Sequence, residues 1–297
     1  MFEKNSHSNG VIYAAIAFAV WGIIPIFWKQ MAYVPAIEIV MHRIVWSLLF
    51  AGGVILALGK WPLLRDALTT RKTLQLLTIS ALLIGMNWGL FIWAVNIGRI
   101  AETSLGYYIN PLVNFSLGVL LLGERLTRIQ LIAIGLACAG VLNQAIAVGV
   151  VPWVSLTLAV SFGLYGLIRK HVAVESLVGL TVEALLLSPL ALGYLIYLDV
   201  NGGGLFLHSD RATDFMLVLA GPLTAIPLLL FAAGVRRIKL STMGFLQYLA
   251  PSISLVLAVV LYNEPFTAAH AVTFGLIWLA LALISWEALT RERYSAA

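Results

Sequence analysis

Charged residues are scarce in this sequence, and their scarcity excludes a water-soluble globule. Only 10% of the 297 residues are Asp, Glu, Lys or Arg, whereas 61% are hydrophobic and the mean hydropathy is +0.99. A soluble domain carries about 25% charged residues, because its surface must be polar. The composition therefore predicts an all-α integral membrane protein whose apolar surface faces lipid.

Cysteine and recognisable catalytic motifs are also lacking. Cys138 is the single cysteine, which excludes an intramolecular disulfide and a cysteine-rich metal site. The sequence contains no HExxH motif and no GxxxxGK[ST] phosphate loop, and every aspartate lies in a loop, Asp214 at the point where the loop meets a span. We therefore expect no enzyme activity, no cofactor and no metal. The net charge of +5 gives little support to nucleic-acid binding.

Long apolar runs, by contrast, are abundant. A helix of about 20 apolar residues crosses a hydrocarbon core roughly 30 Å thick. The sequence predicts ten transmembrane helices and no soluble domain, with spans at 11–28, 36–58, 74–97, 103–122, 128–148, 152–168, 177–198, 214–235, 240–262 and 268–288.

The basic residues predict the orientation of these spans. If the N terminus is cytoplasmic, fourteen of the eighteen Lys and Arg residues lie on the cytoplasmic side and three on the other side. Arg43 lies within a span. Because cytoplasmic segments of membrane proteins are enriched in Lys and Arg, both termini are expected in the cytoplasm.

The chain also repeats itself. The stretch "SLGYYINPLVNFSLGVLLLGERLT" from Ser104 resembles "GFLQYLAPSISLVLAVVLYNEPFT" from Gly244. Each copy belongs to a unit of five predicted spans, so the units 1–148 and 149–297 are expected to have opposite orientations. Inverted repeats are an architecture of secondary transporters. A shift of 140 residues pairs Pro111 with Pro251, Glu124 with Glu264, and Thr127 with Thr267.

These hallmarks resemble the EamA group of the drug/metabolite transporter superfamily. The resemblance rests on the proline-bearing fourth span, the "GE" or "NE" turn with a threonine, and the glycine-bearing fifth span of each half, and it covers essentially the whole chain. It implies alternating-access export or exchange of small metabolites or drugs across the bacterial inner membrane. The cargo, the coupling proton or exchanged solute, and a homodimer remain open. A channel or a non-transporting receptor is the alternative.

Polar and aromatic residues on the spans that line the family's central cavity are the candidate site. Amides and amphipathic aromatics suit a cavity that holds a partly apolar solute. For each aromatic, helix packing or an interfacial belt is the alternative. The candidate substrate-binding residues are Trp21, His42, Arg43, Asn87, Trp88, Tyr107, Tyr108, Asn110, Tyr165, Glu183, Gln247 and Tyr248.

Ionisable residues inside the predicted spans are expected to have a function or a fixed partner, because such residues usually face a bundle interior or a water-filled pathway. In the functional hypothesis, Arg43 holds anionic cargo or organises a gate. In the structural alternative, it snorkels to the outer interface or makes a static hydrogen bond across the bundle. His42, or its repeat-related counterpart Glu183, is expected to take up a proton. Pro111 and Pro251 are expected to kink their helices.

Two further groups receive structural interpretations. Glu124 and Glu264 are expected to cap the helices that follow them, together with the threonines three residues later. Close helix approach is expected at the small residues Gly106, Gly118, Gly135, Gly140, Gly163, Gly166 and Gly275.

Overall fold

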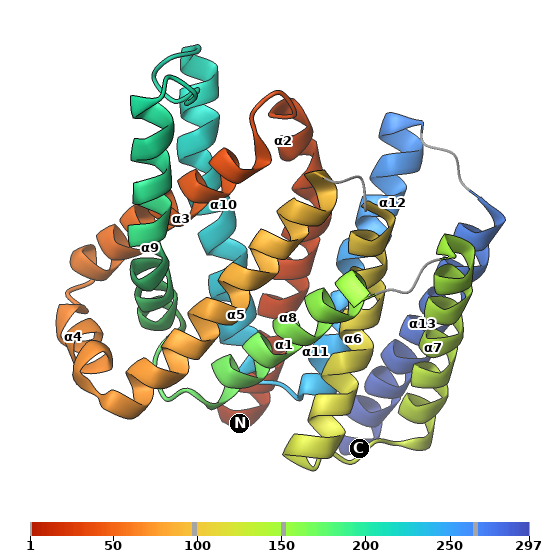
Figure 1. The fold of residues 1–297 in the computed structure, drawn as a ribbon. Coiled ribbons are helices and arrows are strands. Elements are labelled where there is room, and N and C mark those ends of the chain that lie inside the picture. The colour runs from red at the N-terminus through yellow and green to blue at the C-terminus, as the bar shows by residue number, and fades with distance from the viewer. Residues whose placement is uncertain (1, 97–99, 150–152, 264–266, 297) are drawn as a thin grey trace.

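The computed structural model describes residues 2–96, 100–149, 153–263 and 267–296, and every regular element in these ranges is an α-helix (Figure 1). The helices are α1 (Phe2–Ile23), α2 (Pro25–Gln30), α3 (Ala36–Ala57), α4 (Trp61–Thr69), α5 (Arg71–Asn96), α6 (Ile100–Leu122), α7 (Arg128–Val148), α8 (Trp153–His171), α9 (Ser176–Val200), α10 (Arg211–Val235), α11 (Leu240–Gln247), α12 (Leu249–Tyr262) and α13 (Ala268–Ala296).

Within these ranges, nine candidate spans are long and apolar enough to cross a membrane, and they match nine of the ten predicted spans. The exception is α8, because Arg169, Lys170 and His171 in its last turn lower its mean hydropathy. This helix nevertheless packs along α5 and α6. At its start, the Trp153 ring lies 5.7 Å from the Trp93 ring near the end of α5. The tenth span stays a prediction.

Large apolar side chains cover the outside of the bundle. Leu120, Leu190 and Val260, for example, are each at least 70% exposed. A soluble protein rarely leaves so many large apolar side chains in contact with water. Lipid is the solvent that suits this surface, and the chain is an α-helical integral membrane protein.

Helices of the two halves pack mainly against one another. α1 packs against α10 and α12, α3 against α9 and α10, α5 against α8 and α9, α6 against α8 and α11, and α7 against α13. The start of α1 and the end of α13 lie at the same lower edge in Figure 1. Residues brought together between these helices form the candidate site.

The two repeated prolines have different effects on their helices. α6 continues through Pro111, whereas the corresponding span of the second half is divided into α11 and α12 at Tyr248. Pro251 follows this break by three residues. Because proline has no backbone N–H and its ring clashes with the carbonyl four residues earlier, a break at this position is expected.

Glu124 caps a different helix from the one predicted. Its carboxylate accepts hydrogen bonds from the backbone N–H groups of Leu240 and Ser241 and from the Ser241 hydroxyl, at 2.6 to 3.0 Å, so it caps the start of α11. Thr127 caps α7 as expected, in a reciprocal capping box with Gln130. The turn after α6 thus directs Glu124 across to the second half.

In the second half, Thr267 also accepts a hydrogen bond from the backbone N–H of His270 at the start of α13, at 3.3 Å. Glu264 lies outside the described residues, so its predicted capping role stays a prediction.

Candidate functional site

Arg43 of α3 lies close to two tryptophans inside the bundle. Its Nε donates a hydrogen bond of 2.8 Å to the Thr224 hydroxyl of α10. The guanidinium carbon is 5.0 Å from the ring centroid of Trp28 and 5.1 Å from that of Trp88. Contacts of this kind stabilise a cation, because the face of an aromatic ring is electronegative. The guanidinium is therefore held by helices from both halves.

An aromatic wall continues from Trp88 to α6. Phe91, one turn further along α5, packs in the same apolar cluster as Trp88. The Phe91 ring lies 6.1 Å from the ring of Tyr107. Tyr107, about two turns into α6, is 51% exposed. The aromatic wall, defined as Trp88, Phe91 and Tyr107, therefore ends in an exposed ring.

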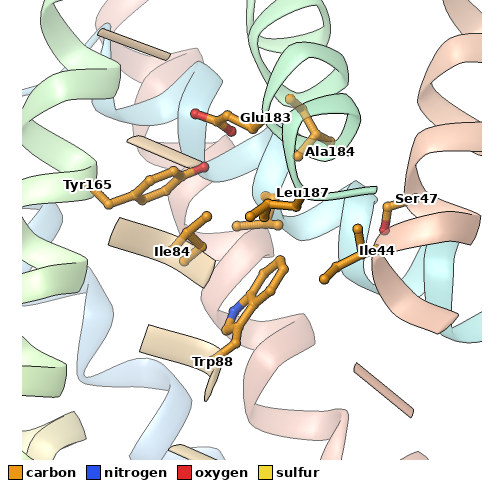
Figure 2. Close-up of a pocket in the computed structure, with 10 residues that line it drawn as sticks. Ile44, Ser47, Ile84, Trp88, Tyr165, Glu183, Ala184 and Leu187 are labelled. Atoms are coloured by element: carbon orange, nitrogen blue, oxygen red, sulfur yellow. The ribbon is translucent and has the colours of Figure 1, made fainter. Parts of the chain in front are cut away.

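A small cavity joins this wall to a buried carboxylate. It measures about 20 Å³, room for about one water molecule. Trp88 lies at one end and Glu183 at the other, with Ile84 and Leu187 between them (Figure 2). The Tyr165 ring enters from the side, and its hydroxyl points toward Glu183.

Glu183 belongs to a buried ion pair that joins three helices. Its Oε1 lies 3.6 Å from Nη1 of Arg169, and the two side chains are 3% and 1% exposed. The same oxygen accepts a hydrogen bond of 2.5 Å from the Ser80 hydroxyl of α5. The Tyr165 hydroxyl points toward the same carboxylate (Figure 2). The charge of Glu183 is thus compensated by side chains of α5 and α8.

Sequence reasoning missed Arg169 and treated it as one of the cytoplasmic loop charges. The structure turns its guanidinium inward, over the backbone of Gly179, where Nη2 donates a hydrogen bond of 3.0 Å to the Ser176 carbonyl. Its Nε and Nη1 are buried without a hydrogen-bond partner in the described part of the chain. The available sequence signal was the spacing of four residues between Tyr165 and Arg169, which places both on one face of α8.

His42 does not meet Glu183, its counterpart in the repeat. His42 is buried, and its Nδ1 accepts a hydrogen bond of 3.2 Å from Nε1 of Trp46. Its ring packs 4.8 Å from the Phe206 ring, and no described residue is a hydrogen-bond partner of its Nε2. His42 therefore faces the connection between α9 and α10.

The predicted amides form helix-to-helix hydrogen bonds. Asn87 of α5 donates 2.9 Å hydrogen bonds to the Leu158 carbonyl and the Ser161 hydroxyl of α8.

On α6 and α11, the Asn114 amide, which the sequence analysis did not single out, bonds to Gln247 at 2.8 Å and to Asn110 at 3.4 Å. All three of these side chains are buried. They form a polar cluster at the contact between the two halves.

The remaining aromatic candidates lie in packed clusters. Tyr108 and Tyr248 are buried together between α6, α7, α12 and α13, where the Tyr248 hydroxyl donates a hydrogen bond of 3.2 Å to the Tyr108 carbonyl. Trp21 lies 5.9 Å from both Phe162 and Phe231, as measured between ring centroids. The structure thus places Arg43 against Trp88 and links Trp88 through Phe91 to Tyr107, and it places the other aromatics in helix contacts.

Apolar helices that enclose charged, amide and aromatic side chains define a multi-pass membrane protein with a polar interior. Residues 8–143 match the EamA-like transporter family. The chain is 44% identical to the uncharacterized transporter YojE of Bacillus subtilis (strain 168), over 97% of each chain. It is 41% identical to Protein RarD of Streptomyces exfoliatus, over 100% of this chain and 94% of that one. It is also 42% identical to Protein RarD of Escherichia coli (strain K12), over 96% of each.

These matches show that the chain belongs to the EamA-like transporter family, as the sequence resemblance implied, and that it is a multi-pass protein of the bacterial inner membrane. A solved crystal structure of a protein 19% identical in sequence superposes with a TM-score of 0.71, over 92% of this chain and 96% of that chain. This likeness shows the fold.

Proposed function

We propose that this protein is a secondary active transporter that moves small metabolites or drugs across the bacterial inner membrane by alternating access, as an exporter or exchanger. The chain and its relatives share a family of transporters. The mechanism is our inference from the arrangement of the helices. A carrier of this kind needs two halves that can exchange conformations around a central site.

The helix packing supports two inverted repeats, 1–148 and 149–297. The repeat relates α1 to α8, α3 to α9, α5 to α10, α6 to α11 and α12, and α7 to α13. If each helix is replaced by its partner in the repeat, the contact of α1 with α10 becomes the contact of α8 with α5, which is also present. In the same way, the contact of α3 with α10 becomes that of α9 with α5. The contacts α3–α9, α6–α11 and α7–α13 each join a helix to its own partner in the repeat. This recurrence is the observation that carries the proposal.

Orientation and site residues complete the proposal. The bias of basic residues supports a cytoplasmic location for both termini. Arg43, Trp88 and Tyr107 lie at the contact between the halves, where cargo would bind. Asn87, Asn110 and Gln247 are proposed to maintain the helix contacts around this position, with Trp21, Tyr108 and Tyr248 in the packed clusters beside it.

Counterflow distinguishes a carrier from the alternative, a channel or a non-transporting receptor. A metabolite comparison of media from cells lacking and overexpressing the protein supplies a test cargo. In proteoliposomes, we expect uptake of this labelled cargo to saturate and to be accelerated by unlabelled cargo inside, because exchange returns the loaded site. Uptake that does not saturate would indicate a channel, and binding without flux a receptor.

Proton coupling is proposed to run through Glu183, which lines the cavity that ends at Trp88. The double variant Arg169→Met/Glu183→Gln removes the titratable group without leaving a buried charge unpaired. We expect it to retain counterflow and to lose the acceleration of uptake by a pH gradient. The matched variant His42→Gln is expected to retain both. A pH-gradient response that survives in the double variant and disappears in His42→Gln would assign the proton to His42.

A further inference from the structure

The guanidinium of Arg43 retains unused hydrogen-bonding capacity. An arginine has five N–H donors. Among the described residues, the only hydrogen bond of Arg43 is the one from Nε to Thr224. Arg43 is half-buried, and its terminal nitrogens are not among the atoms sealed from solvent without a partner, in contrast to Nε and Nη1 of Arg169. The terminal nitrogens of Arg43 therefore keep some exposed surface together with unused donors.

Within the described ranges, Arg43 also lacks the kind of negatively charged partner that Arg169 has. Arg169 has Glu183 as its counter-charge, whereas no described carboxylate forms an ion pair with Arg43. Two indole rings and one hydroxyl stabilise the cation only in part. A positive charge within a membrane bundle is costly unless it has a partner or a water-filled path. An anionic ligand would supply the missing compensation.

The surroundings of Arg43 specify what kind of anion fits. The guanidinium carbon lies about equally far from the Trp28 and Trp88 rings, at 5.0 and 5.1 Å, and the aromatic wall continues through Phe91 to the exposed ring of Tyr107. A planar carboxylate can accept two parallel hydrogen bonds from an arginine fork. An apolar or aromatic body attached to this carboxylate would lie along the wall.

We propose that Arg43 is the anion-binding group of the cargo site and that the cargo class is organic carboxylates with an apolar or aromatic body. The inference rests on the proposed transporter function, because it places the site at the contact between the halves. It assigns separate roles to the two buried arginines. Arg43 recognises the ligand, and Arg169 compensates Glu183.

Four probes test the inference by calorimetric titration of the purified protein in detergent. They are 3-phenylpropionate, its neutral amide 3-phenylpropionamide, propionate without the ring, and the cation phenethylamine. We expect 3-phenylpropionate to bind at least about tenfold more tightly than the other three, because only this probe combines a carboxylate with an aromatic body. Equal affinity for the acid and its amide would overturn the proposal.

Variants assign the binding to Arg43. Arg43→Gln is expected to weaken 3-phenylpropionate binding by about tenfold or more, and Arg43→Lys by several-fold, because lysine keeps the charge but loses the planar fork. Arg65→Gln, on the exposed face of α4, is the matched control and should bind as the wild type does. If Arg43→Gln does not fold, Arg43→Lys and Trp88→Leu serve as the test. Unchanged affinity in the folded variants would reject the site.

Transport measurements separate this inference from the proposed function. If 3-phenylpropionate binds through Arg43 but no solute shows counterflow, the anion site stands and the transporter proposal fails. If a cargo found by metabolite comparison shows counterflow that Arg43→Gln and Arg43→Lys leave unchanged, the transporter proposal stands and the anion site is refuted.

Discussion

Replacing Arg169 with alanine is expected to lower the free energy of unfolding by about 3–5 kcal/mol, because Glu183 would stay buried without its counter-charge. Both side chains are almost fully enclosed, at 1% and 3% exposure. Bulk solvent therefore does not screen the charge of Glu183 in the folded protein. The loss can be measured by equilibrium unfolding of the purified protein in mixed detergent micelles.

The double variant Arg169→Met/Glu183→Gln should recover most of this loss, since it leaves no buried charge and keeps hydrogen-bonding groups beside Ser80 and Tyr165. Arg65→Ala, on the exposed face of α4, is the matched control and should change stability by no more than about 0.5 kcal/mol. If Arg169→Ala is as stable as the wild type, the pair does not hold α8 to α9.

Gly221→Ala is expected to cost about 3 kcal/mol, at the upper end of the usual range for overpacked sites. A Cβ at Gly221 would lie 2.3 Å from the Cβ and 2.5 Å from the carbonyl carbon of Trp46, and 2.7 Å from the backbone nitrogen of Ser47. Backbone atoms cannot rotate away, so α3 and α10 would have to separate. Unfolding in mixed micelles measures the loss.

Gly193→Ala on α9 is the matched control, because a Cβ there would meet no described atom within 4 Å. We expect this variant to be as stable as the wild type or slightly more so. Gly221→Ala should also break the 3.0 Å hydrogen bond from the Ser47 hydroxyl to the Gly221 carbonyl and displace Thr224 from Arg43. Equal stability of the two alanine variants would contradict the close contact of α3 and α10.

Features that depend on local chemistry could be predicted from the sequence. Hydropathy located nine of the spans, and the place of Thr127 just before an apolar run predicted its cap on α7. The sequence also predicted a span at 152–168, yet the hydropathy of α8 itself falls short of that of a membrane span, because its terminal charges count against it although Arg169 is enclosed by protein. An average over a helix carries no information about the partners of individual side chains.

The site was harder to predict, because the face that a helical residue presents depends on contacts between distant segments. Tyr107 and Tyr108 are neighbours in sequence, yet the first is exposed and the second is packed against Phe274. The helix approach inferred at Gly135 was wrong, since a Cβ there would meet no described atom within 4 Å, as also at Gly275. The close approach at Gly221 was missed. Gly221 packs against α3, where Ser47 is 174 residues away along the chain.

The capping contact of Glu124 has a mechanical consequence. Three hydrogen bonds fix the turn after α6 to the first residues of α11, so these two segments must move as one rigid body unless all three bonds break. The chain then interrupts its helix at Tyr248, before α12 begins. The start of α11 is therefore held to the turn after α6, and the break at Tyr248 is the point where this span can bend. We expect a rearrangement of the span to change the angle between α11 and α12 and to leave the hydrogen bonds of Glu124 in place.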